Sequence, residues 1–113
     1  MEQDLRVEIT QLHAQVCSGL SEPTRILILY KLAENPTKVS DLAEALAIPQ
    51  PTISRHLKVL RDRRLVLAQR EGQSVYYSLA DERIIQALDL LRAVLASSLE
   101  NQAAMIRSAS DHQ

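Results

Sequence analysis

The sequence predicts a mainly α-helical domain that carries one small β-hairpin. Apolar residues recur at helical spacing along most of the chain, Gly occurs only twice among 113 residues, and one run, Leu65 to Leu79, alternates as strands do. All three aromatic residues are Tyr, so the core must be built from aliphatic side chains on helices. The length fits one domain, expected over residues 1–106, with residues 107–113 expected to form a disordered tail.

Three helices are predicted in the first half of the chain. The first runs from about Gln3 to Cys17 with a single apolar stripe, and the second follows Ser21-Glu22-Pro23, where a capping residue precedes a proline suited to a first helical turn. Because the second helix is apolar almost all round, it is expected to form the centre of the core. Asn35-Pro36-Thr37 ends it, and a short third helix is expected over Asp41–Leu46, capped by Ser40.

A fourth helix is predicted to begin near Gln50, after the tight connection Ala47-Ile48-Pro49. Its apolar residues share one face, and its polar residues point away from that face. The apolar residues are Ile53, Leu57 and Leu60, and the polar ones include Thr52, Ser54, Arg55 and Lys58. A short helix, a short turn and a basic helix in this order predict a helix-turn-helix.

Two strand-like runs follow the fourth helix. Leu65–Arg70 and Ser74–Leu79 flank Glu71-Gly72-Gln73, in which Gly72 is free to take a positive φ. They predict a hairpin of the size of a wing. With a last helix after it, the predicted order is α-α-α-α-β-β-α, a winged helix-turn-helix.

Positive charge is concentrated in the fourth helix and the hairpin. Between Gln50 and Gly72, six Lys or Arg residues stand against two acids, whereas the whole chain has a net charge of −1. Lys and Arg that neutralise phosphates supply most of the sequence-independent affinity for duplex DNA, and side chains on an inserted helix read base edges. From charge alone, a DNA-reading helix and an ordinary solvated helix face are equal alternatives, and the helix-turn-helix and hairpin around this helix favour the first.

Asp81 is expected to cap a long last helix. Its apolar positions are spaced four, three, four and four residues apart, and further apolar residues broaden the face: Ile84, Leu88, Leu91, Leu95 and Leu99, with Ile85, Ala87, Val94 and Ala96 beside them. One small domain cannot bury so wide a surface. The sequence therefore predicts a two-fold homodimer that packs through the last helix, together with the first.

Four segments carry a resemblance to a known family. They are Leu20–Leu29, Leu42–Leu46, Thr52–Leu60 with its Ser-Arg-His-Leu core, and Arg70–Leu79, which opens with Arg-Glu-Gly. In order and separation they resemble the ArsR/SmtB bacterial transcriptional repressors, over about Val16 to Leu99. The resemblance implies a winged helix-turn-helix homodimer that releases double-stranded operator DNA when a metal, metalloid or redox signal arrives.

The resemblance also implies two groups of DNA-binding residues. The first group would face the major groove, with a phosphate contact at its end: Gln50, Thr52, Ser54, Arg55, His56 and Lys58. The second group would follow the minor groove or its phosphates: Arg70, Gly72 and Gln73. Since His56 lies about 60° from the centre of the apolar face by the helical period, a structural His that hydrogen-bonds across the helix pair is an equal alternative.

The chain departs from the family pattern at its metal ligands and at the end of the fourth helix. Metal-sensing members carry a Cys-x-Cys pair on the third helix, or Asp and His on the last; here the third helix has no thiol, and Arg83, Val94 and Ser97 follow Asp81. A lone carboxylate beside Arg is a poor zinc site, so no metal and no cofactor are predicted. Arg64 replaces the usual helix-ending Gly, so the helix is expected to end differently or Arg64 to contact phosphate.

Cys17 is the only cysteine and is open to two interpretations. Its place beside the apolar stripe favours a small, semi-buried hydrophobe. The alternative is a sensor thiol near the two-fold axis that pairs with its copy, or that is modified by thiol-reactive compounds or a soft arsenical.

The leading prediction is a sequence-specific DNA-binding regulator, a repressor released by a signal whose identity the sequence does not give. The alternatives are a winged-helix module that docks an acidic protein, and a repressor that responds to a small ligand or metalloid at an atypical site. No grouping of nucleophile, base and orienter is present, so no enzyme and no catalytic residue is predicted. Without a signal-peptide pattern or a membrane-length apolar run, the protein is expected in the cytoplasm, away from membranes.

Overall fold

The computed structural model describes residues 2–111, and its chain forms two compact units that meet between Glu82 and Arg83. The first unit begins with α1 (Glu2–Leu12), a π-helical turn (His13–Cys17) and a 3-10 turn (Ser18–Leu20). The predicted first helix, Gln3–Cys17, therefore covers both α1 and the π turn. The change of helix type places Cys17 in a wider turn just before the main fold.

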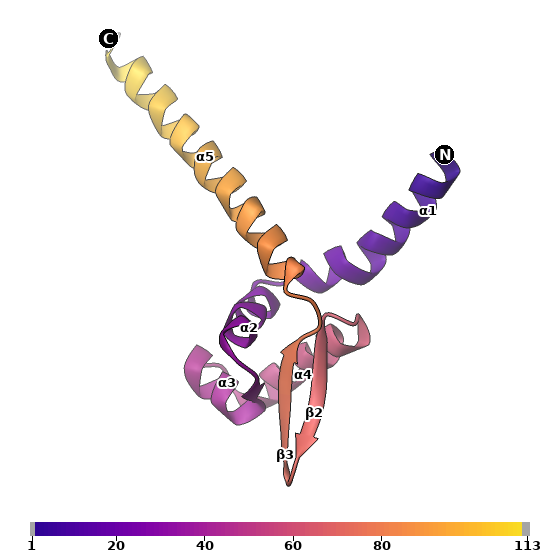
Figure 1. Cartoon of the computed structure of the whole chain (residues 1–113). Helices are drawn as coiled ribbons and strands as arrows, with labels where there is room; N and C mark the ends of the chain where they lie inside the picture. Colours follow the sequence, from indigo (N-terminus) through magenta and orange to yellow (C-terminus); the bar gives the residue numbers. More distant parts are fainter. Residues whose placement is uncertain (1, 112–113) are drawn as a thin grey trace. The chain divides into compact units, whose positions relative to one another are not determined.

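The helix-turn-helix and the wing follow in the predicted order (Figure 1). The helices are α2 (Pro23–Glu34), α3 (Val39–Leu46) and α4 (Gln50–Asp62), and the hairpin strands are β2 (Val66–Glu71) and β3 (Ser74–Leu79). The mainly helical winged helix-turn-helix is thus confirmed. Glu22, not Ser21, is the N-cap of α2, because its carboxylate accepts the Thr24 N–H at 3.0 Å.

A third strand, β1 (Thr37–Lys38), was not predicted from the sequence. It pairs antiparallel with β3, Thr37 opposite Tyr77 and Lys38 opposite Tyr76, and the strand order is β1-β3-β2. A two-residue strand is too short for alternation to reveal it, so only the pairing with β3 makes it visible. The strand attaches the start of α3 to the sheet.

Three helices, the first hairpin strand and Leu65, which directly precedes that strand, supply the core of this unit. The core side chains are at most 3% exposed: Ile28, Leu29, Leu32, Leu42, Ile53, Leu57, Leu60, Leu65 and Val66. The expectation that α2 is buried all round is too strong, because Leu27 is 50% exposed. The buried residues of α4 are the three that the sequence pattern selected.

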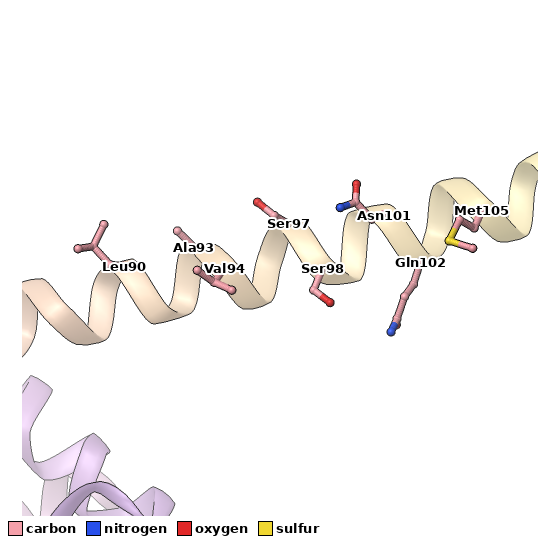
Figure 2. Close-up of a pocket in the computed structure, with 8 residues that line it drawn as sticks. All are labelled: Leu90, Ala93, Val94, Ser97, Ser98, Asn101, Gln102 and Met105. Atoms are coloured by element: carbon pink, nitrogen blue, oxygen red, sulfur yellow. The ribbon is translucent and has the colours of Figure 1, made fainter. Parts of the chain in front are cut away.

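The second unit is a single long helix, α5 (Arg83–Asp111). It continues past the expected boundary at residue 106, since Ala103, Ala104 and Met105 are good helix formers, and residues 107–111 are helical where a disordered tail was expected. Residues 112 and 113 lie outside the described part of the chain. Figure 2 shows an open, mainly apolar strip along α5 that includes Leu90, Val94 and Met105. No helix within residues 2–111 has the length and apolar character to cross a bilayer.

Candidate nucleic-acid interface

The apolar face of α4 fixes which side chains the helix presents outward. Ile53, Leu57 and Leu60 are at most 1% exposed. Polar residues on the other side of the helix are turned to the surface, and Ser54, Arg55, Lys58 and Arg61 are all exposed. Sequence periodicity alone therefore places this basic face correctly.

The N-terminal end of α4 offers few backbone donors. Pro49 occupies the N-cap, and its carbonyl accepts the N–H groups of Thr52 at 3.0 Å and Ile53 at 3.1 Å. Pro51 has no N–H at all. Side chains, not backbone amides, must therefore supply polar contacts to a ligand at this end of the helix.

Two of the basic side chains on α4 are held by weak contacts along the helix. The Arg55 guanidinium donates to the Thr52 hydroxyl at 3.4 Å, and Lys58 Nζ lies 3.1 Å from the Asp62 carboxylate. An exposed pair four residues apart on a helix contributes only about 0.3 to 0.5 kcal/mol. Both cations can therefore move to an external phosphate or base at little cost.

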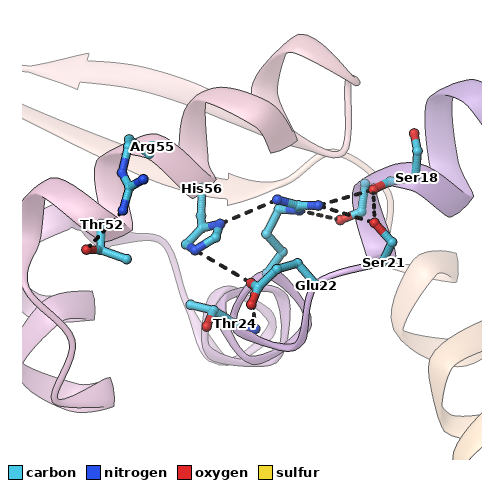
Figure 3. A network of polar contacts seen from close by, with 9 residues as sticks. Ser18, Ser21, Glu22, Thr24, Thr52, Arg55 and His56 are labelled. Atoms are coloured by element: carbon cyan, nitrogen blue, oxygen red, sulfur yellow. Dashed lines mark hydrogen bonds and ion pairs between the residues drawn. The ribbon is translucent and has the colours of Figure 1, made fainter.

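His56 lies apart from the exposed basic residues and faces α2. Its side chain is 17% exposed, its Nε2 is 3.5 Å from Glu22 Oε2, and its Nδ1 is 3.5 Å from Arg25 Nη1 (Figure 3). In this view Arg55 lies to the left, beside Thr52 and away from Glu22. Of the two interpretations of His56, this geometry favours the structural His that bonds across the helix pair.

The two neighbours of His56 also select its tautomer. A guanidinium can only donate, so Nδ1 must accept from Arg25, and Nε2 then carries the proton and donates to Glu22. A proton on Nδ1 would point at the Arg25 cation. The contact between α2 and α4 therefore gives the imidazole ring a defined orientation.

The wing presents its polar residues around a two-residue loop. Glu71 pairs with Ser74, which leaves Gly72 and Gln73 as the loop. Gly72 has φ 63°, and a positive φ at the first loop position is what a type II′ turn requires. Arg70, Gly72 and Gln73 are all exposed, so the three predicted wing residues lie together near the hairpin tip.

Both helices of the helix-turn-helix end in left-handed residues that are not glycine. Arg64 has φ 62°; the Leu65 N–H donates to the Leu60 carbonyl at 2.9 Å and the Arg64 N–H to the Arg61 carbonyl at 3.0 Å. This is the Schellman pattern that usually employs Gly. Ala47, with φ 55°, ends α3 in the same way. The helix end expected to change at Arg64 thus keeps the geometry that usually employs Gly, with backbone strain at Arg64.

Three residues that tie α4 to the rest of the unit were not among the predicted site residues. Arg25 and Glu22 contact His56, and Arg63 reaches back to the Ala14 carbonyl and the Ser18 hydroxyl. A charged residue at position 25, next to the apolar body of α2, was the one sequence signal of such a role. The contacts of Arg63 span so many residues that no local pattern could have indicated them.

Cys17 is exposed, in contrast to the semi-buried position that was favoured from the sequence. Within residues 2–111, no three His, Cys, Asp or Glu side chains gather in a way that could hold a metal ion.

Comparison with known proteins places the chain in a family. Residues 22–67, which contain α2, α3 and α4, match the family described as "Bacterial regulatory protein, arsR family". The transcriptional regulator NmtR of Mycobacterium tuberculosis is 43% identical over 83 residues, covering 71% of this chain and 69% of NmtR. The chain belongs to the arsR family. It is therefore a transcriptional regulator and not an enzyme.

Other relatives of this arsR-family chain include a repressor and a solved dimer. The transcriptional repressor SmtB of M. tuberculosis is 38% identical over 77 residues, which span 68% of this chain but only 57% of SmtB. A homodimeric winged helix-turn-helix DNA-binding domain from Mycobacterium bovis superposes with a TM-score of 0.75 at 31% identity, covering 87% of this chain and 91% of that domain. The likeness thus extends beyond the helix-turn-helix itself.

Proposed function

We propose that this arsR-family chain is a homodimeric repressor that binds an inverted-repeat operator through α4 and the wing. The observation that carries the proposal is the division of α4 into a fully buried apolar face and an exposed basic one. A helix oriented in this way, following a short helix and a short turn, is the arrangement that enters a major groove. The SmtB and M. bovis relatives support the repressor and dimer parts of the proposal.

Exposed apolar side chains on α1 and α5 support the homodimer. On α1, Leu5, Val7 and Ile9 are each at least 50% exposed. On α5, seven large apolar side chains are at least 56% exposed: Leu90, Leu91, Val94, Leu95, Leu99, Met105 and Ile106. Apolar surface of this extent is unusual on a monomer and is typical of an interface. A second copy covers it economically, because a two-fold axis uses the same surface twice.

In the proposed complex, each group of site residues has a distinct role. Arg55 reads a base edge with Thr52, Ser54 and Gln50 nearby, Lys58 neutralises a phosphate, and the wing residues follow the adjacent backbone. Two α4 helices related by the two-fold axis would enter successive major grooves roughly 34 Å apart. His56 does not read a base in this proposal; it supports the surface by bonding α4 to Glu22 and Arg25 beside it. Such a repressor works where the bacterial chromosome lies, in the cytoplasm.

The proposal is tested by selecting duplexes from a randomised DNA pool with the parent protein and measuring their affinity by fluorescence anisotropy. Arg55→Ala should weaken binding by about 1 to 3 kcal/mol if Arg55 contacts a base through two hydrogen bonds. Arg92→Ala is the matched control, because it removes one positive charge from α5, outside α4 and the wing. Equal losses for both variants would show that Arg55 contributes charge alone.

Failure to select any duplex at low salt would reject the operator-binding proposal outright. In that case the winged-helix module that docks an acidic protein would be the better account. A selected sequence with two-fold symmetry would support both the repressor and the dimer.

We also propose Cys17 as the residue that receives the signal. The thiol is exposed, and the next residue, Ser18, is contacted by both Arg25 and Arg63, so an adduct at Cys17 would disturb groups that hold α4. Oxidants or arsenite should release DNA from the parent and not from Cys17→Ser. Equal release from both proteins would exclude the thiol and direct attention to a small ligand or a metalloid at another site.

A further inference from the structure

We infer that Arg63 and Arg25 are positioning residues, which set the orientation of α4 by tying it to the segment that joins α1 to α2. This connecting segment comprises residues 14–21. The inference rests on the proposed DNA-binding function and adds a second layer of residues to it, because neither arginine is among the residues proposed to touch DNA.

The first tie holds the C-terminal end of α4. Arg63 is the C-cap residue, and its guanidinium donates from Nη1 to the Ala14 carbonyl and to the Ser18 hydroxyl. Its side chain also packs against Gly19, where an added Cβ would lie 3.2 Å from Arg63 Cδ. One end of the reading helix is therefore bonded and packed against the connecting segment.

The second tie holds the middle of α4 and uses Arg25 as its centre. Arg25 Nε donates to the Gly19 carbonyl at 2.8 Å, and Nη2 donates to the Ser18 carbonyl at 3.2 Å (Figure 3). Its remaining nitrogen, Nη1, reaches His56 Nδ1 at 3.5 Å, and Glu22 holds the opposite side of the imidazole. One guanidinium thus connects two carbonyls of the connecting segment with a side chain of α4.

Both ties end on the same short stretch, Ser18-Gly19. The apolar contacts of Ile53, Leu57 and Leu60 hold α4 against the core, but such contacts are non-directional and permit small rotations and shifts along the helix axis. Polar contacts at two points, His56 and Arg63, restrict that freedom because hydrogen bonds depend on both distance and angle. The position of the connecting segment is thereby passed to the DNA-reading face.

The test compares Arg63→Gln with Arg61→Gln on duplexes selected by the parent protein. Each variant removes one positive charge from the end of α4, but among the described residues only Arg63 forms hydrogen bonds with the connecting segment from this end of the helix. If Arg63 positions α4, Arg63→Gln should weaken binding at least about fivefold more than Arg61→Gln does. Circular dichroism confirms that each variant is folded at the assay temperature.

A double-mutant cycle with Arg55→Ala separates positioning from a general loss of stability. Arg55 and Arg63 are eight residues apart on α4, about 12 Å along the axis, a separation at which independent effects multiply to within about twofold. If Arg63 acts by aiming Arg55, the loss caused by Arg55→Ala should be at least about threefold smaller in the Arg63→Gln background. A role confined to stability would leave the two losses multiplicative.

Two milder variants keep the test valid if Arg63→Gln does not fold. Ser18→Ala removes one acceptor of Arg63 without any change in charge, and Arg25→Lys keeps the charge while losing the planar fork that spans the two carbonyls and His56. Both should weaken binding, and both should reduce the effect of Arg55→Ala.

Three outcomes can be distinguished. A reduced effect of Arg55→Ala in these backgrounds supports the inference. Equal losses for Arg63→Gln and Arg61→Gln, with multiplicative effects in every cycle, overturn it while leaving the proposed function intact. If the parent protein selects no duplex, the proposed function fails, and the positioning role fails with it.

Discussion

Gly19 packs against Arg63 and Leu65 at the end of α4, and its replacement by Ala should destabilise the fold by a calculable amount. The added Cβ would lie 2.7 Å from Leu65 Cδ1, whereas carbon atoms in contact are normally about 3.5 to 4.0 Å apart. Leu65 is only 2% exposed and has little room to move. Overpacking of this kind destabilises a protein by about 1 to 3 kcal/mol. Because Ala makes the unfolded chain less flexible than Gly does, about 0.4 to 1 kcal/mol of that loss is offset. The difference lies between about 0 and 2.6 kcal/mol, and the expected net loss in the free energy of unfolding is about 1 kcal/mol, near the middle of that range.

Urea denaturation followed by circular dichroism at fixed protein concentration measures this loss, since the stability of a dimer depends on concentration. For a chain of this size, each kcal/mol corresponds to a fall in Tm of roughly 4 °C or more. Leu65→Val removes the atom in closest contact, so Gly19→Ala should cost less in the Leu65→Val background than in the parent. A Gly19→Ala variant as stable as the parent, or a cost unchanged by Leu65→Val, would refute the close contact.

Three further predictions concern the helix end, the salt dependence and the dimer. Arg64→Gly should raise the free energy of unfolding by about 0.5 to 1 kcal/mol in urea denaturation, because φ 62° strains Arg but not Gly; unchanged stability would contradict the strain. Lys58→Ala should lower the slope of log affinity against log salt by about 1, and an unchanged slope would remove Lys58 from the phosphate contacts. Leu95→Glu should convert the dimer to a monomer in light scattering, because it places a charge in the exposed apolar face of α5; a dimeric Leu95→Glu protein would place the interface elsewhere.

The sequence predicts the elements of this fold wherever a pattern repeats within one element. The buried residues of α4 follow from helical spacing, and the hairpin follows from alternation around Gly72, because each depends on the geometry of a single segment. The boundaries at α1 and β1 do not follow in this way. The π turn at His13–Cys17 has no local signature, and β1 exists through its pairing with β3.

The same distinction applies to the site. The exposure of Arg55 and Lys58 is local information and was predicted, but the surroundings of His56 depend on residues contributed by α2. The helical period placed His56 at the border of the apolar face of α4, where a His can point either to a partner helix or to DNA. Only the positions of Glu22 and Arg25 decide between these two directions. Long-range polar contacts are therefore the part of the site that sequence reasoning could not provide.

The strengths of the contacts around α4 suggest why a regulator would hold its reading helix in this way. Burial of Ile53, Leu57 and Leu60 contributes roughly 1.5 to 3 kcal/mol for each side chain and keeps the helix in the fold. Hydrogen bonds such as those of Arg25 and Arg63 contribute net stabilisation of only about 0.5 to 1.5 kcal/mol, or somewhat more for a charged donor. Allosteric coupling energies are typically about 1 to 3 kcal/mol. A signal that breaks one or two polar ties at Ser18-Gly19 therefore has enough energy to reorient α4, yet far too little to expel it from the core.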